Sequence, residues 1–193
     1  MRVAVLNNYP AGRGWRALRR IKRSLKTLGA TPIVIDPSRA LDGGFDAYLL
    51  TGTSPAMGGP PPRIKEELLF VRRADAPVLG ICFGLHLIAQ AFGARLVKMP
   101  SRRVGFKELR IRSANPLLDG LDGALVWENH KVRVADEALT GSSLEVLASC
   151  PDNPVEVVQV RGRRVFGVQF HPERHDEARR GGLVVLSNFL SLA

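Results

Sequence analysis

The sequence predicts an α/β fold, an open and mostly parallel sheet flanked by helices, with extra short antiparallel strands in the second half. Two patterns predict it: apolar strand-length segments alternate with helical patterns up to Gly93, and short strand patterns follow one another from Ala94 onward. The 193 residues are 45% hydrophobic and 24% charged, which is ordinary globular usage and enough to bury a core. No linker or internal repeat divides the chain, so we expect a single domain over residues 1–193.

In the first half, the expected strands are apolar runs bounded by turn residues, and the expected helices carry apolar residues at helical spacing. The strands are expected at residues 2–6, 31–35, 47–50 and 77–81, and the helices at 15–28, 62–73 and 83–92. Gly29 and Gly93 stand where helices should stop. The Gly- and Pro-rich segment 51–62 is expected to be a loop.

The second half is expected to be built from short strands. They are predicted at residues 104–112, 124–127, 144–148, 155–160 and 165–170. The last two flank Arg161-Gly162-Arg163 and should form a hairpin. A closing helix is predicted over residues 176–192, although the pair Gly181-Gly182 falls inside it.

The charge of the chain is strongly positive. It has 28 Lys and Arg against 18 Asp and Glu, a formal net charge of +10. Much of the excess lies in residues 15–28, where basic residues alternate with apolar ones at helical spacing and should form the outer face of a helix. Such an excess fits an acidic partner protein, an anionic substrate, nucleic acid or a plain solvated surface. Nucleic acid is the least expected, because no aromatic residues interleave along the basic face.

Several classes of protein are not expected. No apolar run approaches the ~18–20 residues that cross a bilayer, and the N-terminus turns polar too early for a signal peptide. The two cysteines, Cys82 and Cys150, form no disulfide framework, so we expect a cytoplasmic protein without a membrane partner. The scattered histidines and cysteines lack zinc-ligand spacing and no nucleotide-binding fingerprint is present, so we expect no metal and no cofactor.

The most informative segment places Cys82 between a predicted strand and a predicted helix. Gly80 and Gly84 flank it at offsets of two, the spacing of a nucleophile elbow. Such a turn lifts the thiol to the carboxyl edge of the sheet, where open α/β folds bind ligands, and the helix start should lower the thiol pKa. The N–H of Phe83 could then donate to an oxyanion. Taken alone, the motif could equally be a buried cysteine in a tight turn.

A second motif supports the catalytic interpretation. His171 and Glu173 stand at i and i+2, so their side chains should project to one face, and Pro172 should end the strand. His171 could take the thiol proton while Glu173 fixes the imidazole tautomer. His175 is expected to be solvated at the start of the last helix, and Cys150 to be an inert thiol because it lacks the glycine flanks.

Together these motifs resemble the signature of the class I (triad) glutamine amidotransferases. The matching residues are Gly80-Ile81-Cys82-Phe83-Gly84 and Gln169-Phe170-His171-Pro172-Glu173; residues 50–55, 115–121 and 126–132 resemble further family segments. In length the chain is most similar to the free-standing glutaminase component of archaeal-type GMP synthetases. The resemblance implies a flavodoxin-like arrangement of the parallel sheet.

The resemblance also implies a set of site residues. Cys82, His171 and Glu173 would be the catalytic triad. The implied oxyanion and substrate-binding residues are Gly52, Thr53, Phe83, His86, Asn129, His130 and Lys131. Three of them depart from the family pattern: His86 stands where glutamine is usual, Thr53 where glycine is usual, and Lys131 in place of a Gly-Asp pair.

The implied function is hydrolysis of the glutamine side-chain amide through a cysteine thioester, giving glutamate and ammonia. The ammonia would pass to a synthetase on a separate chain, such as the ATP-pyrophosphatase component of GMP synthetase in purine biosynthesis. The basic helix at residues 15–28 could dock on an acidic surface of that partner. Two alternatives stay open. One is a stand-alone γ-glutamyl hydrolase or peptidase with the same triad, which the departure at His86 supports. The other is a non-catalytic basic binding module.

Overall fold

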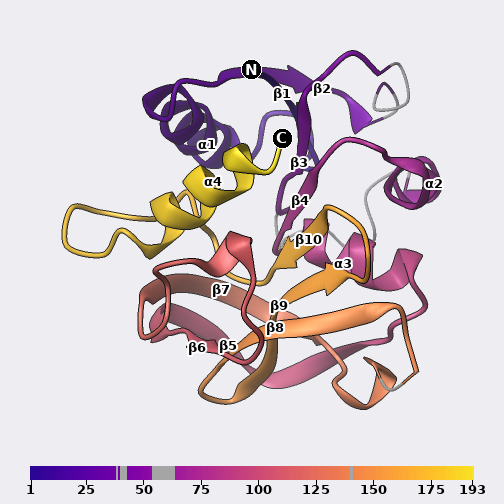
Figure 1. Cartoon of the computed structure of the whole chain (residues 1–193), viewed down its shortest axis with the longest axis vertical. Coiled ribbons are helices and arrows are strands. Elements are labelled where there is room, and N and C mark those ends of the chain that lie inside the picture. The colour runs from indigo at the N-terminus through magenta and orange to yellow at the C-terminus, as the bar shows by residue number, and fades with distance from the viewer. Residues whose placement is uncertain (38, 40–42, 54–63, 140) are drawn as a thin grey trace.

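The computed structural model covers residues 1–193 and describes residues 1–37, 39, 43–53, 64–139 and 141–193. Its main sheet has the order β2-β1-β3-β4-β10-β9-β8-β6 in that described part (Figure 1). These strands are β1 (Arg2–Leu6), β2 (Thr31–Ile35), β3 (Ala47–Leu50), β4 (Val78–Ile81), β6 (Arg110–Ile111), β8 (Leu144–Cys150), β9 (Asn153–Val160) and β10 (Val165–Val168). A separate antiparallel pair consists of β5 (Leu96–Glu108) and β7 (Leu125–Val134).

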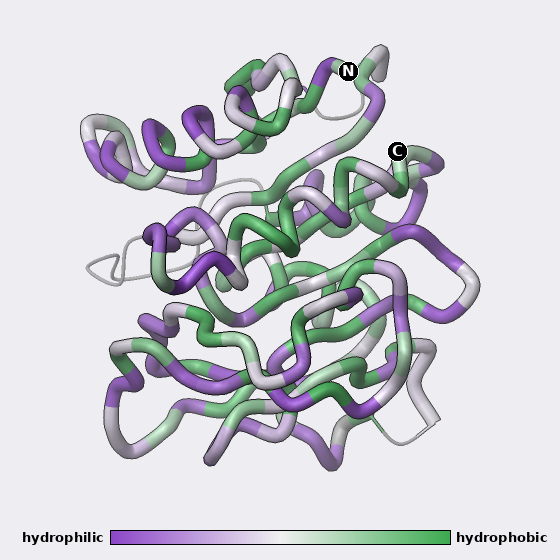
Figure 2. The backbone as a smooth tube through the Cα atoms, turned by 60° about the vertical axis from the view of Figure 1, so that its left-hand side comes forward, coloured by the Kyte–Doolittle hydropathy of each residue, from purple (hydrophilic) through white to green (hydrophobic). Residues whose placement is uncertain are grey.

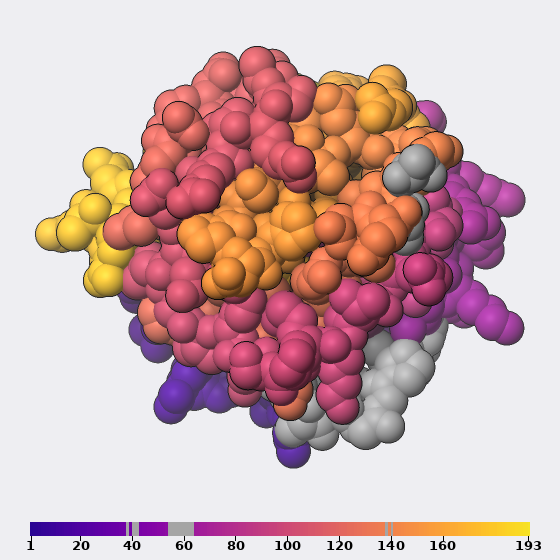
Figure 3. All heavy atoms as spheres, turned by 90° about the horizontal axis from the view of Figure 1, so that it is seen from below, coloured from indigo at the N-terminus to yellow at the C-terminus, as the bar shows by residue number. Residues whose placement is uncertain are grey.

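The predicted fold class is confirmed. Strands β2, β1, β3, β4 and β10 run parallel, and β9, β8 and β6 extend the sheet as antiparallel strands. The predicted hairpin is the β9–β10 pair, with Gly162 at φ +69° in its turn. The view from below is dominated by the magenta-to-orange part of the chain, which holds β5 to β9 (Figure 3).

Helices cover both faces of the parallel part of the sheet. Helices α1 (Trp15–Thr27) and α4 (Gly181–Ser191) lie on one face, and α2 (Ile64–Arg73) and α3 (Phe83–Ala91) on the other (Figure 1). Because side chains alternate along a strand, β1 sends Val3 and Val5 into one core and Ala4 and Leu6 into the other. Hydrophobic residues (green) concentrate in the central strands and α4, whereas hydrophobic and hydrophilic (purple) residues alternate along α1 (Figure 2).

The first-half elements agree with the expected bounds to within two residues where the structure describes them. The helix expected to begin at residue 62 is described from Ile64. Most of the loop expected at 51–62 lies outside the described residues. Among the described residues, no helix combines the length and hydrophobicity needed to cross a membrane.

The strand predicted at 104–112 is wrong in its extent. Strand β5 already begins at Leu96 and ends before the fully buried Leu109. The Leu109 N–H donates to the Ala124 carbonyl at 2.8 Å, and Arg110–Ile111 then joins the main sheet as β6. Strand β7 likewise runs seven residues beyond the predicted end at Trp127. In the part of β7 beyond Trp127, the buried side chains include Glu128 and His130, so the alternation of apolar and polar residues that marks a strand is missing.

The closing helix begins at Gly181 and not at Asp176. The Asp176 carboxylate accepts a hydrogen bond from the Arg179 N–H at 2.8 Å and closes a turn instead. A Cβ on Gly182 would lie 2.3 Å from the Pro172 carbonyl oxygen. The two glycines therefore mark the start of α4, where the helix packs against the backbone that follows His171.

Candidate active site

The elbow around Cys82 is built as the spacing predicted. Cys82 links β4 to α3 with φ 52° and ψ −97°, a conformation that is strained for a residue with a side chain. A Cβ on Gly80 would meet the Gly84 carbonyl at 2.4 Å, and a Cβ on Gly84 would meet the Leu50 carbonyl oxygen at 2.5 Å. Glycine at both positions lets the start of α3 lie directly on the strand ends.

Strand pairing brings the histidine motif to the same sheet edge. β10 lies parallel to β4 with Val168 opposite Ile81, so the residues that follow each strand emerge side by side. The Cys82 N–H donates to the Val168 carbonyl at 2.8 Å. Residues 82 and 171, far apart in sequence, therefore share the carboxyl edge of the sheet.

His171 and Glu173 form a buried pair next to Cys82. His171 Nδ1 lies 3.0 Å from Glu173 Oε1, and the two side chains are 10% and 2% exposed. The His171 N–H donates to the Trp127 carbonyl at 2.7 Å, which fixes the backbone under the ring. A Cβ on Gly52 would lie 3.3 Å from His171 Cε1 and 3.7 Å from Cys82 Cβ, so the Gly52 backbone borders both side chains.

The charges around His171 favour its protonated form. Burial lowers the pKa of His171, but the negative charges of Glu173 and the Cys82 thiolate, with hydrogen bonds to both side chains, raise it to about 10. The imidazole beside Cys82 is therefore favoured in the form that can donate a proton. Tyr9 lies at the same edge, where burial and the charges of Glu173 and Cys82 raise the pKa of its hydroxyl, so it stays neutral.

The segment expected to hold an oxyanion is anchored to the end of β1. The Asn8 N–H donates to Thr51 Oγ1 at 2.9 Å, and Thr53 Oγ1 donates to the Asn8 carbonyl at 2.7 Å. Phe83 is the first residue of α3, so its N–H has no carbonyl within the helix to bond. Ser54 and Pro55 of the proposed family loop lie outside the described residues.

A cavity of about 370 Å³ opens beside Cys82. It is lined by Thr53, Cys82, Phe83, His86, Lys98, Arg102, Asn129, His130, Lys131 and Val132. The structure therefore brings together Cys82 and six of the seven oxyanion and substrate-binding residues expected from the sequence. Gly52 does not line the cavity, although a Cβ there would lie 3.7 Å from Cys82 Cβ. Lys98, Arg102 and Lys131 give the cavity a positive rim, and no carboxylate is among its lining residues.

His86 connects to the thiol through a buried glutamine. His86 Nε2 lies 3.1 Å from Gln169 Oε1, and Gln169 Nε2 lies 3.8 Å from Cys82 Sγ. Burial lowers the pKa of His86 to about 4, against hydrogen bonding by Gln169, so the ring is neutral at physiological pH. A neutral His86 can donate to Gln169, which turns the Gln169 amide N–H toward the sulfur.

A buried ionic network lies behind His130. Arg103 Nε donates to Glu128 Oε2 at 2.5 Å, and Glu128, His130 and Glu156 offer ligand atoms within 4.8 Å of one another. Burial and the charge of Glu128 raise the pKa of Glu156, which favours its neutral form. Arg103 thus already balances the Glu128 charge, and the expectation that the protein uses no metal stays a prediction.

Two minor expectations have clear outcomes. The expectation that His175 is solvated at a helix start is wrong. His175 is half-buried and precedes α4, and its Nε2 lies 3.0 Å from Ser24 Oγ of α1. Cys150 is buried, and burial with the charges of Glu156 and Glu128 raises the pKa of its thiol, which agrees with an inert role.

Four residues near the site were missed by sequence reasoning: Tyr9, Lys98, Arg102 and Gln169. Tyr9 follows the end of β1 and Gln169 the end of β10, so their positions after parallel strands were a usable signal. The register of β5 shifts between Lys98 and Arg103, and Arg102 lies within that interval. Pro100 between them hid the strand from the pattern analysis.

Comparison with known proteins decides the family. The model of the family described as "Glutamine amidotransferase class-I" matches residues 17–191. The chain belongs to the class-I glutamine amidotransferase family. It is therefore related to a family of enzymes, and the resemblance drawn from the two motifs is confirmed.

Individual relatives of this amidotransferase are GMP synthases. It is 30% identical to a glutamine-hydrolysing GMP synthase subunit of Saccharolobus solfataricus, over 89% of this chain and 90% of that protein. It is 32% identical to the GMP synthase of Thermus thermophilus over 93% of this chain, which spans only 35% of that longer protein. The crystal structure of a candidate GMP synthase subunit from Thermoplasma acidophilum matches with a TM-score of 0.84 and 26% identity, covering 100% of this chain and 93% of that one.

Proposed function

We propose that this amidotransferase hydrolyses the side-chain amide of glutamine, with Cys82 as nucleophile, His171 as acid and base, and Glu173 as the group that orients His171. The observation that supports it most is the buried His171–Glu173 pair beside a thiol held at positive φ. The glutamine-hydrolysing relatives supply the substrate class. We further propose that residues 1–193 act as one domain.

The first half-reaction forms a thioester. The Cys82 thiolate attacks the amide carbon, and the carbonyl oxygen becomes an oxyanion facing the Phe83 N–H and an N–H of the Gly52–Thr53 segment. The His171 imidazolium gives its proton to the amide nitrogen as the carbon–nitrogen bond breaks. Ammonia leaves, and a γ-glutamyl thioester remains on Cys82.

The second half-reaction restores the enzyme. His171, now neutral, takes a proton from a water molecule that attacks the thioester carbon. The carbon–sulfur bond breaks, glutamate leaves, and the thiolate again faces an imidazolium. Glu173 keeps its charge throughout and holds His171 Nδ1 as a donor, so that Nε2 faces the reacting atoms.

The cavity fits the other end of the substrate. Glutamine carries an α-carboxylate, and Lys98, Arg102 and Lys131 surround the cavity with positive charge. Asn129 offers an amide oxygen that can accept a hydrogen bond from the α-amino group. We expect loss of the Lys131 charge to raise KM for glutamine more than it lowers kcat.

The released ammonia would serve a synthetase. The relatives are GMP synthases, and the longer ones contain about two thirds of their length outside the matched region. These 193 residues hold no phosphate loop or nucleotide fingerprint. Because the relative that matches over 90% of its own length is a GMP synthase subunit, we infer that the acceptor is the synthetase part of a GMP synthase, supplied by a partner.

The direct test is ammonia release from glutamine by the wild type and by Cys82→Ala. The variant should keep the melting temperature and lose at least a thousandfold of the rate, because nucleophilic catalysis then has no nucleophile. Cys150→Ala is the matched control and should keep full activity. Turnover retained in Cys82→Ala would contradict the mechanism.

A stand-alone γ-glutamyl hydrolase is the second candidate, because His86 occupies the cavity wall where the family usually has glutamine. Release rates from glutamine and from γ-glutamyl peptides, measured side by side, separate the two. Glutamine should be preferred by at least tenfold, and a preference for the peptides would favour the second candidate.

A further inference from the structure

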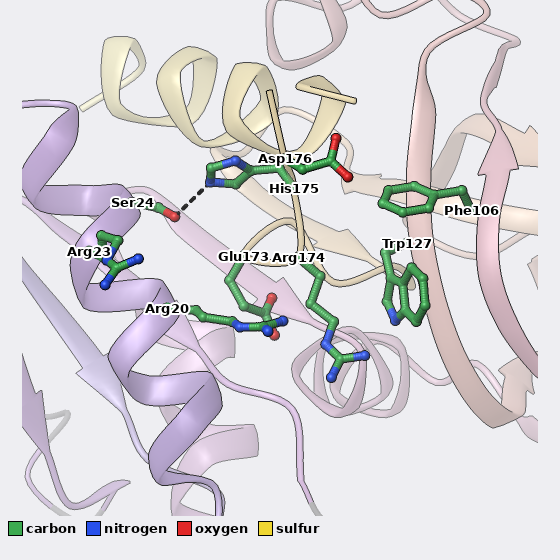
Figure 4. Close-up of a pocket in the computed structure, with 9 residues that line it drawn as sticks. All are labelled: Arg20, Arg23, Ser24, Phe106, Trp127, Glu173, Arg174, His175 and Asp176. Carbon is green, nitrogen blue, oxygen red and sulfur yellow. Dashed lines mark hydrogen bonds between the residues drawn. The ribbon is translucent and has the colours of Figure 1, made fainter. Parts of the chain in front are cut away.

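A second cavity shares no lining residue with the substrate cavity and includes Glu173 in its wall. It has a volume of about 490 Å³ and is lined by Arg20, Arg23, Ser24, Phe106, Trp127, Glu173, Arg174, His175 and Asp176. Helix α1 forms one wall, Phe106 and Trp127 form the opposite wall, and residues 173–176 lie between them (Figure 4). Three guanidinium groups therefore border one hollow beside the proposed triad.

The two carboxylates in this cavity are already engaged by the chain itself. Glu173 bonds to His171, and Asp176 forms an ion pair with Arg179. In the described part of the chain, Arg20 and Arg23 form no ion pair with any acidic residue. Arg20 and Arg23 therefore leave unpaired positive charge in the cavity wall; among the described residues, Glu173 Oε2 is buried without a hydrogen-bond partner.

The positive surface continues along the whole of α1. This helix has no acidic residue, and all six of its basic residues are exposed: Arg16, Arg19, Arg20, Lys22, Arg23 and Lys26. Two further hollows adjoin the cavity and share Arg20 or Arg23 with it, and Trp15 between them is 57% exposed. Thirteen residues of helix span about 20 Å, which is longer than a single small anion can cover.

We propose that this surface, α1 together with residues 173–176, docks an acidic segment of the synthetase that uses the ammonia. The inference rests on the proposed function. Paired carboxylates on the partner would bond to Arg20 and Arg23 and reach Arg174 in the cavity, since guanidinium groups bind carboxylates in a bidentate way. Complementary charge would also steer the encounter.

A partner docked in this cavity would lie close to the residues that position His171. Arg174 directly follows Glu173, and its guanidinium lies over the Trp127 ring at 5.2 Å. The Trp127 carbonyl in turn accepts the His171 N–H. A partner bound here would lie next to the residues that hold His171, and so next to the place where ammonia is formed.

The test measures binding of the synthetase part of the GMP synthase from the same organism, purified as a separate protein, by calorimetry at low and high salt. Arg20→Glu/Arg23→Glu should weaken binding at least tenfold, and high salt should weaken wild-type binding. Arg73→Glu/Arg95→Glu is the matched control: both positions are exposed, they lie outside the proposed surface, and the change in charge is the same. The control should bind like the wild type.

A second measurement does not depend on the variants. The chain has two tryptophans: Trp15 belongs to the proposed surface, and Trp127 lines the cavity that this surface borders. In a chain labelled with 5-fluorotryptophan, adding unlabelled synthetase should shift both fluorine resonances. Unshifted resonances in a complex that does form would overturn the docking surface.

The remaining outcomes separate this inference from the proposed function. Equal binding by the wild type and both variants, or an equal loss in both variants, overturns the docking surface while glutamine hydrolysis stands. Binding of an RNA oligonucleotide that needs Arg20 and Arg23, with synthetase binding unaffected, also overturns it. Absence of both glutamine hydrolysis and synthetase binding in the wild type removes the proposed function and the docking surface with it.

Discussion

Substituting Gly84 by alanine tests whether close packing of α3 on the sheet is what positions Cys82. The added Cβ would lie 2.5 Å from the Leu50 carbonyl oxygen and 2.9 Å from Leu50 Cβ, while ordinary contacts begin near 3.4 Å. The start of α3 must therefore move by nearly 1 Å. Overpacking of this kind costs about 3 kcal/mol, which lowers Tm by roughly 6–12 °C for a chain of this length.

The same shift should move the Phe83 N–H and the sulfur away from the substrate. We expect ammonia release to fall by at least a hundredfold, because small misplacements of reacting groups are costly. The assay is Tm by calorimetry together with kcat/KM for glutamine. Gly93→Ala is the control: it has open space and φ +83°, so it should lose some stability and keep its activity. Unchanged Tm and activity in Gly84→Ala would refute the packing argument.

The remaining predictions concern single side chains. Glu173→Gln should lower kcat by about a thousandfold with little change in KM, because an uncharged amide that can donate as well as accept no longer fixes the His171 tautomer or stabilises the imidazolium. The pKa of His171 is about 10 in the folded chain and 6.5 when unfolded, so its protonation stabilises the fold below pH 6.5 and this stability is lost as the pH rises towards 10. Denaturant titrations should show that decline in the free energy of unfolding, and a shallower decline in Glu173→Gln. The pKa of His86 is lowered to about 4, so between pH 6.5 and 4 the ring takes up a proton in the unfolded chain but not in the folded one, which destabilises the fold. The His86→Gln variant should therefore lose less stability than the wild type over that range. Gln169→Leu should slow alkylation of Cys82 by iodoacetamide, since the amide N–H no longer faces the sulfur, and an unchanged rate would contradict that role.

The elbow could be predicted from sequence because its cause is local. Gly80, Cys82 and Gly84 lie within one strand–turn–helix unit, and the physical need for glycine arises inside that unit. His171 and Glu173 could be predicted as a pair for the same reason. That the pair meets Cys82 depends on the β4–β10 register, which the two motifs implied only through the family resemblance.

The missed features have causes that lie outside the local sequence. Strand β7 buries Glu128 and His130, which are tolerated only because Arg103 on the neighbouring strand pairs with Glu128. Gln169 contacts both His86 and Cys82, although it is separated from them in the sequence by 83 and 87 positions, respectively. The late start of α4 follows from the contact between Gly182 and Pro172, which no periodic pattern records.

The central claim is that His171 holds Cys82 as a reactive thiolate. Alkylation of Cys82 by iodoacetamide, followed by mass spectrometry of its peptide from pH 5 to 10 in a Cys150→Ser background, measures this directly. Cys82 beside the His171 imidazole should react faster than a free cysteine over this range, and His171→Ala should remove that difference. A wild-type profile that already matches free cysteine, and does not change in His171→Ala, would contradict the account.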